Sequence, residues 1–246
     1  MFSQSPFTVI PAQSGSAVFC FCDHACKAVP EEYQDLGLSA ADLNRHIGWD
    51  IGAADLTRMF CITFGAAGLL ADFSRLLIDP NRSIDSANLI PEISDGTPIP
   101  ANQNLSSAER QHRIDTYYEP YHLALEAELD KAERRFIDPL IISIHSFTPK
   151  PSTGKTRELD IGLLWKGDEN KAVRVKAEIE RIHPYKIELN EPYSALKLNH
   201  TMDRHVIPRG LRHITLEIRQ DLIDTTAKAQ IMADHLSTAL HHFIGD

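Results

Sequence analysis

Two histidines each follow a short apolar run, a placement typical of residues that do chemistry at the edge of a sheet. His145 lies at the end of a run of leucine and isoleucine that begins after Pro139, and His24 follows the apolar residues 17–22. Runs of this length are typical of strands buried on both faces. In open parallel sheets, ligands bind just outside the carboxyl ends of the strands. We therefore expect the two imidazoles to converge at one edge of a sheet.

Two converging histidines and an acid can hold a divalent metal ion. A catalytic zinc takes three protein ligands, often two histidines and a carboxylate, and leaves one position for water. Asp50 is the carboxylate that we expect there, because the tryptophan and glycines of residues 46–52 permit close packing around it. Two structural alternatives stay open: Asp50 could cap the following helix, and a histidine at a strand end can simply be hydrogen-bonded. The hypothesis is a metal site with zinc as the first choice.

A hydrolytic metal site also needs a general base, and Glu217 suits this role. It lies in an alternating segment, residues 213–219, whose isoleucines and leucine share the opposite face. Desolvation in such a strand would raise the proton affinity of the carboxyl group. The structural alternative is an ion pair with Arg219, two residues further along the same face. We take Glu217 as the candidate base.

Arginines indicate the substrate, because a guanidinium binds a carboxylate through two parallel hydrogen bonds. Arg75 and Arg82 flank a run that also holds Asn81, and together the three predict a pocket for an acidic small molecule. His122 lies in a helical segment rich in tyrosine and interrupted by Pro120. It could orient the substrate or act as an acid.

Strands and helices must position these residues, and the pattern of apolar residues predicts how they are arranged. We expect one α/β domain over residues 1–246, with a mixed, mostly parallel sheet flanked by helices. The expected strands are residues 17–22, 140–146, 159–165, 185–189 and 213–219, and the expected helices are residues 39–43, 51–70, 106–136, 172–182 and a last one from 224 or 225. Residues 83–104 predict a long loop of the kind that forms lids or binding sites. Cys20, Cys22 and Cys26 fit small buried residues on a strand better than a zinc finger.

Composition excludes several partners. The 246 residues are 43% hydrophobic with a net charge of -9 spread along the chain, which argues against nucleic acid or a membrane surface as the main partner. Neither a leader segment nor an apolar stretch long enough to span a bilayer is visible, so we expect a cytoplasmic protein. The oligomeric state is not indicated.

Several ordered segments together resemble the N-formylglutamate amidohydrolase family. They are residues 22–25, 46–53, 74–75, 79–82, 118–125, 144–146, 190–194 and 216–221. The resemblance implies a fold similar to zinc carboxypeptidases, within the phosphorylase/hydrolase-like group, and hydrolysis of an N-acyl amino acid, by preference N-formyl-L-glutamate. It also implies that His145 is the second metal histidine, that Asn81 and Arg82 bind a carboxylate, and that Glu217 is the catalytic glutamate. Tyr193 and Arg219 lie in two of these segments and join the expected substrate-binding residues.

One position departs from the carboxypeptidase pattern. That group has a glutamate three residues after its first metal histidine, and here Lys27 stands at that spacing from His24. Either Asp50 replaces the glutamate, or the metal site is altered or lost. The alternatives are therefore a deacylase or carboxypeptidase-like hydrolase of another substrate, and a metal-free protein that binds a small molecule.

Overall fold

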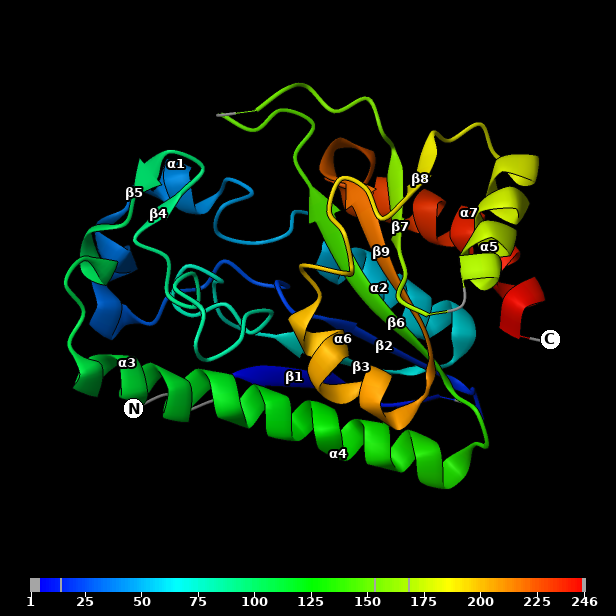
Figure 1. Cartoon of the computed structure of the whole chain (residues 1–246), viewed down its shortest axis with the longest axis horizontal. Helices are drawn as coiled ribbons and strands as arrows, with labels where there is room; N and C mark the ends of the chain where they lie inside the picture. Colours follow the sequence, from blue (N-terminus) through cyan, green and yellow to red (C-terminus); the bar gives the residue numbers. More distant parts are fainter. Residues whose placement is uncertain (1–4, 14, 153, 168, 245–246) are drawn as a thin grey trace.

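The computed structural model describes residues 5–13, 15–152, 154–167 and 169–244, and these form an α/β fold around one large sheet (Figure 1). The strand order in the sheet is β1-β3-β2-β6-β9-β7-β8. The strands are β1 (Phe7–Ile10), β2 (Val18–Cys22), β3 (Ala67–Ala71), β6 (Leu140–Phe147), β7 (Ile161–Leu164), β8 (Ile187–Leu189) and β9 (Arg212–Arg219). The expected mixed sheet flanked by helices is confirmed.

The four central strands run parallel, and this direction creates the site. β3 pairs with β2, β2 with β6 and β6 with β9, all in the same direction, while β1 and β7 are antiparallel to their neighbours β3 and β9. The register between β6 and β9 sets His145 directly opposite Glu217. Because parallel strands end at the same edge of a sheet, the residues that follow these four strands come together.

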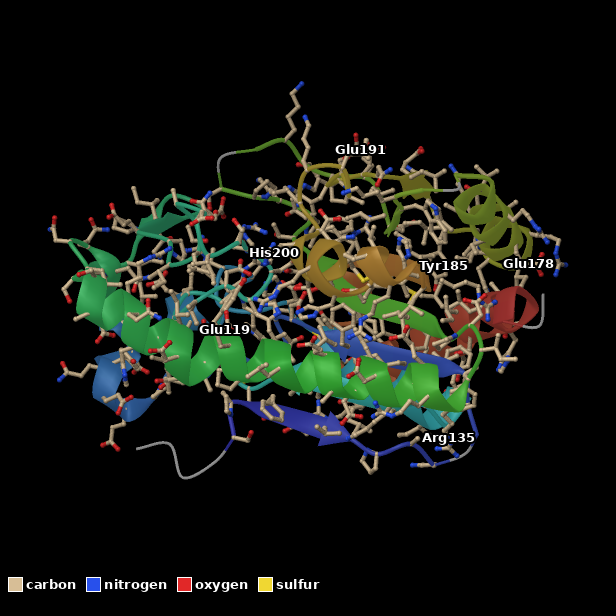
Figure 2. All side chains as sticks on the ribbon, turned by 60° about the horizontal axis from the view of Figure 1, so that its bottom comes forward. Glu119, Arg135, Glu178, Tyr185, Glu191 and His200 are labelled. Carbon is tan, nitrogen blue, oxygen red and sulfur yellow. The ribbon has the colours of Figure 1, made fainter. Side chains whose placement is uncertain are left out.

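Apolar side chains on both faces of the sheet form two cores. On one face, Cys20 and Ile142 pack beneath α2 (Ala53–Phe64), α5 (Glu169–Ile182) and α7 (Thr226–Ile244). On the other, Phe21 and Ile141 pack beneath α4 (Glu119–Arg135) and α6 (His200–His205). Figure 2 shows α4 along this second face, from Glu119 to Arg135. Burial on both faces explains why β2 is apolar throughout and why β6 begins with three apolar residues in succession, Leu140 to Ile142.

The prediction of one helix over residues 51–70 is wrong, because the chain turns at Gly65. α2 ends there with Gly65 in the left-handed conformation at a φ of 61°, and the N–H of Ala66 donates to the carbonyl of Cys61. Glycine adopts this conformation without steric cost and commonly ends helices. The apolar residues that follow form β3, which lies between β1 and β2 and is covered on both faces. β1 has no counterpart among the expected strands.

The remaining elements follow the expected capping signals. Ser39 caps the short α1 (Ala40–Leu43), and Ser106 caps α3 (Ser107–Arg113) by accepting from the N–H of Glu109. A π-helical turn, Ile114–Tyr118, joins α3 to α4, and Pro120 follows directly in the first turn of α4. The long connection over residues 83–104 holds only the hairpin β4 (Ile93–Ser94) and β5 (Thr97–Pro98) and a 3₁₀ turn, Pro100–Asn102. Within the described ranges, no helix combines the length and apolar character needed to cross a membrane.

Candidate active site

The carboxyl ends of the four parallel strands deliver the polar residues of one buried cluster. β2 leads into His24, β6 carries His145 near its end, and β9 carries Glu217 two residues before its end. The segment after β3 brings Arg75 to the same edge. Asp50 arrives from the loop before α2, where its backbone N–H donates to the carbonyl of His24 at 2.9 Å. The sequence prediction that the two imidazoles converge with an acid is confirmed.

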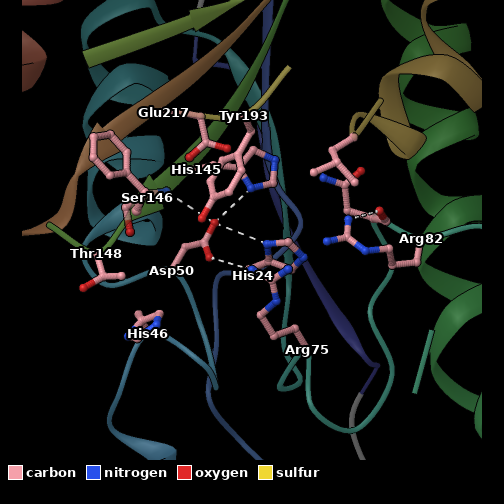
Figure 3. A pocket seen from close by; sticks show the side chains of 13 residues that line it. His24, His46, Asp50, Arg75, Arg82, His145, Ser146, Thr148, Tyr193 and Glu217 are labelled. Carbon is pink, nitrogen blue, oxygen red and sulfur yellow. Dashed lines mark hydrogen bonds and ion pairs between the residues drawn. The ribbon is translucent and has the colours of Figure 1, made fainter. Parts of the chain in front are cut away.

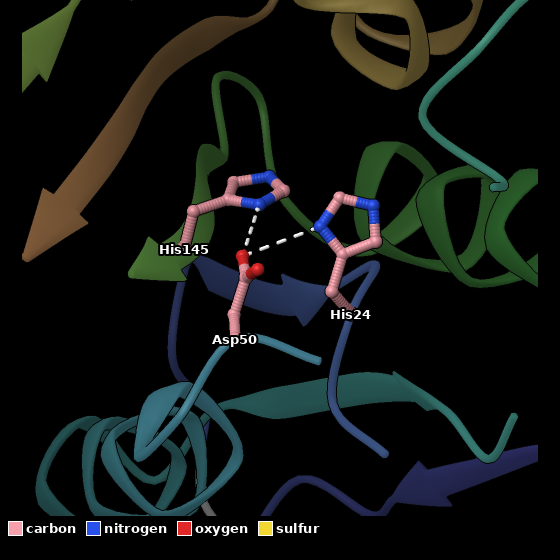
Figure 4. A group of neighbouring side chains, drawn as sticks. All are labelled: His24, Asp50 and His145. Carbon is pink, nitrogen blue, oxygen red and sulfur yellow. Dashed lines mark hydrogen bonds and ion pairs between the residues drawn. The ribbon is translucent and has the colours of Figure 1, made fainter. Parts of the chain in front are cut away.

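His24, Asp50 and His145 form a compact group that could hold a metal ion (Figure 4). Asp50 Oδ2 lies 3.2 Å from His24 Nδ1 and 2.9 Å from His145 Nδ1, and the three ligand atoms all lie within 4.8 Å of one another. Each residue exposes 3% of its surface or less. In a tetrahedral zinc site with bonds of about 2.0–2.2 Å, neighbouring ligand atoms lie about 3.3–3.6 Å apart. The donor types are those that bind zinc, while the separations of 3.2 and 2.9 Å are slightly shorter than this range and are those of hydrogen bonds within the cluster.

The far nitrogen of His24 is held by a carboxylate, as in many metal-binding histidines. Its Nε2 donates to Asp79 Oδ1 at 2.7 Å, which leaves Nδ1 to face Asp50. Such outer hydrogen bonds fix the ring orientation and raise ligand basicity. His145 Nε2 has no hydrogen bond within the described residues and faces Asp23 Oδ2 at 3.6 Å, while Tyr121 donates to the other oxygen of that carboxylate. A carboxylate thus lies behind each imidazole.

The ionisation of the cluster follows from its charges. Burial lowers the pKa of His145, but the hydrogen bond and charge of Asp50, with the charge of Glu217, outweigh it and raise the pKa to about 9. Burial also lowers the pKa of His24, yet the carboxylates of Asp79 and Asp50 raise it above its ordinary value. Although burial acts to raise the pKa of Asp50, the charge of His24 and the hydrogen bond from His145 hold it far below the usual range. Without metal, the cluster carries protons that a cation would displace.

Arg75 completes this network from one side. Its Nη1 donates to Asp50 Oδ1 at 3.2 Å and its Nη2 to Asp79 Oδ2 at 2.8 Å. Together with His24, Arg75 keeps the pKa of Asp79 well below its usual range, although burial acts in the opposite direction. Both terminal nitrogens of this arginine are therefore committed to the acids of the cluster.

Glu217 lies beside the cluster in an environment that suits a general base. Burial raises its pKa to about 7, while the charge of His145 lowers it and that of Asp50 raises it. Its Oε2 has no hydrogen-bond partner among the described residues. Arg219 does not neutralise it, because that guanidinium pairs with Asp160 and Asp221 instead. A buried carboxyl that titrates near neutrality can take and return a proton.

A cavity of about 110 Å³ opens onto the cluster (Figure 3). Its lining includes eight residues that the sequence singled out: His24, Asp50, Arg75, Asn81, Arg82, His145, Tyr193 and Glu217. His46, Ser146, Phe147, Thr148 and Leu198 complete the wall. Buried acids, imidazoles and an uncompensated carboxyl around a small cavity are groups from which a hydrolytic metal centre could be built.

Comparison with known proteins identifies the family of the chain. A family model for N-formylglutamate amidohydrolase matches residues 16–224. The chain belongs to this family. The crystal structure of gene product Atu2144 from Agrobacterium tumefaciens is 31% identical, with a TM-score of 0.91 over 98% of this chain and 96% of that one. N-formylglutamate amidohydrolase from Ralstonia eutropha JMP134 is 22% identical, with a TM-score of 0.69 over 98% of both chains, and shares the fold. A search of curated proteins finds no match. Membership makes the protein an amidohydrolase.

Lys27, the departure from the carboxypeptidase pattern, lies outside the cavity of this amidohydrolase. Its ammonium donates to Asn44 and lies 5.6 Å from the ring centroid of Trp49. Asp50 occupies the third corner of the ligand group instead and does not cap α2, whose N-cap residue Gly52 provides no side-chain hydrogen bond. Gly52 has a φ of 80°, and a Cβ there would lie 2.0 Å from the carbonyl oxygen of Ile223, so only glycine fits.

Two expected site residues lie away from the cavity. His122 is buried between α4 and α6, where its Nε2 donates to the carbonyl of Pro80 and its Nδ1 lies 2.8 Å from His205 Nε2. Neither His122 nor Arg219 lines the cavity, and each is already engaged by protein groups. The described structure gives neither residue access to a substrate there.

Two acids of the site were not among the residues chosen as functional, although Asp23 was considered beside Asp50 as an acid near His24. Asp79 supports His24 and binds Arg75, and Asp23 lies behind His145. Both follow a strand in the sequence, Asp23 directly after β2 and Asp79 eight residues after β3. The signal for Asp79 was its place beside Asn81 and Arg82, in a segment that we had assigned only to substrate binding.

Proposed function

We propose that the protein hydrolyses the amide bond of an N-acylated acidic amino acid, by preference N-formyl-L-glutamate, with one divalent cation, zinc by preference. The observation that carries the proposal is the convergence of His24, Asp50 and His145 beside the buried carboxyl of Glu217. Family membership supports an amide hydrolase, and the geometry supports a metal-assisted one.

The three ligand residues would hold the cation through two imidazole nitrogens and one carboxylate oxygen. When bound, such a cation polarises the amide carbonyl and lowers the pKa of a water molecule. Asp79 fixes the ring of His24, and the backbone N–H of Ser146 donates to Asp50 Oδ2 at 3.3 Å. These supports keep the ligand atoms in place without a change of conformation, which lowers the cost of binding the ion.

Glu217 moves the proton in this mechanism. It takes a proton from the attacking water and then gives it to the nitrogen of the leaving amino acid, so that the C–N bond breaks and formate and glutamate are released. Its raised pKa of about 7 supports both halves of the transfer near neutral pH. Burial also removes competing bulk water around the carboxyl group, which strengthens its electrostatic interaction with the reacting atoms.

Arg82, Asn81 and Tyr193 would hold the carboxylates of the substrate. Arg82 uses one hydrogen bond, from Nη1 to the carbonyl of Asn81, and has two guanidinium nitrogens without a partner among the described residues. Asn81 is positioned by Thr201, whose N–H donates to Asn81 Oδ1 at 3.0 Å. Arg75 contributes differently from our expectation, because it is bound to Asp50 and Asp79. Its role in the proposal is to keep both acids ionised.

Hydrolysis assays of the N-formyl, N-acetyl and N-succinyl derivatives of glutamate test this function, with N-formyl-glutamine as the control whose side chain is neutral. We expect hydrolysis of N-formyl-glutamate by metal-loaded protein, and loss of that hydrolysis with a chelator and recovery with zinc. Glu217→Gln should lower kcat by about 10²- to 10⁴-fold and leave the bound metal in place. Full turnover by Glu217→Gln, or hydrolysis that survives removal of all metal, would contradict the proposal.

A further inference from the structure

A second cavity adjoins the active-site cavity and is larger. Its volume is about 350 Å³, compared with about 110 Å³ for the first, and the two share His46, Arg75, Arg82, Thr148 and Tyr193 as walls. We call it the Arg157 pocket, after the arginine that lines only this second cavity. Because the shared residues form a common boundary, a substrate held at the cluster can extend into the Arg157 pocket.

The acids around the Arg157 pocket are already neutralised. Asp79 is bound by His24 and Arg75. Asp95 pairs with Arg45 Nη2 at 3.4 Å and accepts hydrogen bonds from the backbone N–H and the hydroxyl of Ser152. Neither carboxylate is therefore free to attract a cation or to repel an anion strongly. The charge that remains available in this pocket is positive.

Two arginines supply that charge. Arg157 donates through Nη1 to the carbonyl of Thr148 at 3.3 Å and to the hydroxyl of Tyr193 at 3.2 Å. Its Nε and Nη2 have no hydrogen-bond partner within the described part of the chain. Arg82, on the shared wall, uses one hydrogen bond to a backbone carbonyl. Both guanidinium groups therefore keep donors for a ligand.

Aromatic rings fix the orientation of Arg157. Its guanidinium carbon lies 5.1 Å from the ring centroid of Tyr193 and 5.7 Å from that of Phe147. A guanidinium held this way presents its remaining donors in one plane, the arrangement that binds a carboxylate with two hydrogen bonds. Tyr193 also lines the active-site cavity, so the same tyrosine connects Arg157 to the reaction site.

We propose that the Arg157 pocket binds a second carboxylate of a substrate that is longer than one N-acyl amino acid. The fitting class is an N-acyl dipeptide with an acidic second residue, whose first residue and scissile amide occupy the site cavity. This inference rests on the proposed amide hydrolysis and extends its substrate class. The same carboxylate chemistry could come from a dicarboxylic acyl group, and the test separates the two sources.

The test compares N-formyl-glutamate, N-formyl-glutamyl-glutamate, N-formyl-glutamyl-glutaminamide as the analogue whose second residue is neutral, and N-succinyl-glutamate. We expect the wild-type enzyme to have a higher kcat/KM for the acidic dipeptide than for the neutral analogue, by about tenfold, because a hydrogen-bonded charge pair is lost in the analogue. In Arg157→Gln, the ratio of kcat/KM for the acidic dipeptide to that for N-formyl-glutamate should fall by about tenfold, mainly through KM. Arg157→Lys should lie between, since it keeps the charge and loses the planar fork.

Arg181→Gln is the matched control, because it removes the same charge from an exposed arginine of α5 that pairs with Glu178. Its substrate ratio should match the wild type. If Arg157→Gln leaves the dipeptide ratio at the wild-type value, the proposal is wrong. If the substitution changes only the ratio of kcat/KM for N-succinyl-glutamate to that for N-formyl-glutamate, the pocket binds the acyl group and the dipeptide proposal is also wrong. If no N-acyl amino acid is hydrolysed, the proposed function fails, yet calorimetric binding of the acidic dipeptide that is weakened in Arg157→Gln would still support the pocket.

Discussion

Two pairs of buried histidines lie on the same side of the sheet, and only one of them belongs to the reaction site. The ring centroids of His24 and His145 are 5.1 Å apart, and those of His122 and His205 are 5.0 Å apart. All four side chains are buried. The first pair shares the carboxylate of Asp50, whereas the second pair hydrogen-bonds internally and to a backbone carbonyl.

These different partners move the pKa values in opposite directions. Burial lowers all four, but the carboxylates around the first pair reverse the effect and raise the pKa of His145 to about 9. Around the second pair, the charge of Arg204 adds to burial and lowers the pKa of His205 to about 4, and the pKa of His122 also lies well below its ordinary value. The neighbours of a buried imidazole therefore decide whether it can bind a cation or has a structural role.

The neutral pair has a definite hydrogen-bond order. Because the carbonyl of Pro80 can only accept, His122 donates from Nε2 and its Nδ1 accepts from His205 Nε2–H. Thr201 contacts the same carbonyl and the side chain of Asn81, so α4 and α6 together hold the backbone before Arg82. We infer that this pair positions the carboxylate-binding residues and takes no part in proton transfer.

The largest effect should come from removing the carboxylate that the first pair shares. Asp50→Asn leaves the shape of the cluster nearly unchanged but removes the charge that joins both imidazoles and a cation. We expect kcat/KM to fall by about a thousandfold or more, which corresponds to several kcal/mol of transition-state stabilisation. Steady-state assays with metal-saturated protein measure it, and His122→Gln is the matched control on the second pair. A fall in kcat/KM of less than tenfold in Asp50→Asn would contradict the assignment of the first pair to the reaction site.

Asp79→Asn should have a smaller effect on the same pair. Asparagine can still accept from His24 Nε2 but cannot add negative charge behind the imidazole. Loss of such an outer partner typically weakens metal affinity by about 10- to 100-fold. Competition with a chelating indicator measures the affinity directly. Wild-type affinity in Asp79→Asn would show that the His24–Asp79 hydrogen bond does not tune the site.

In metal-free protein, the two histidine pairs should change the free energy of unfolding with pH in opposite directions. The pKa of His145 is raised, so its contribution to stability is present below about pH 6.5 and is lost as the pH rises through about 9. The pKa of His205 is lowered, so the unfolded state binds more protons and stability falls as the pH drops from about 6.5 towards 4.

For one such histidine, linkage gives a loss of about 2 kcal/mol between about pH 7 and pH 5. Urea unfolding at the two pH values measures this loss. His205→Gln should show less of it than the wild type, because glutamine keeps a donor for His122 and does not titrate. Equal losses in the two proteins would mean that the second pair is not held neutral by the fold.

In activity assays, the smallest change should come from a substitution in the second histidine pair. His122→Ala removes the support of the Pro80 carbonyl, and we expect KM for N-formyl-glutamate to rise by about two- to tenfold, the usual effect of one lost hydrogen bond. kcat and bound metal should remain near wild type, and His122→Gln should restore KM. A large fall in kcat with normal KM would instead support a role for His122 as an acid.

The sequence predicted the strands of the site better than it predicted the partners within it. β2, β6 and β9 were visible because apolar residues on a buried strand form a local pattern, and each strand carries or leads into a polar residue of the site. The two histidine ligands could be chosen for the same reason, whereas Asp50 was chosen for the tryptophan and glycines around it. β3 was hidden because its apolar residues continue the spacing of α2, and only Gly65 marks the boundary.

Partners far apart in the chain could not be found in this way. His24 and Asp79 are 55 residues apart, and Arg157 meets Tyr193 across 36 residues. His122 had the same local features as a functional histidine, a kink signal and neighbouring tyrosines. Its separation from the cavity depends on how α4 and α6 pack against the sheet, which the spacing of residues does not encode.

Titration of chelator-treated protein with zinc by calorimetry at about pH 8 tests the central claim, that His24, Asp50 and His145 form one cation site. We predict that the wild type and His205→Gln each bind one ion per chain with similar affinity, and that Asp50→Asn binds at least about tenfold more weakly. Equal binding by Asp50→Asn and the wild type, or no binding by the wild type, would contradict the account.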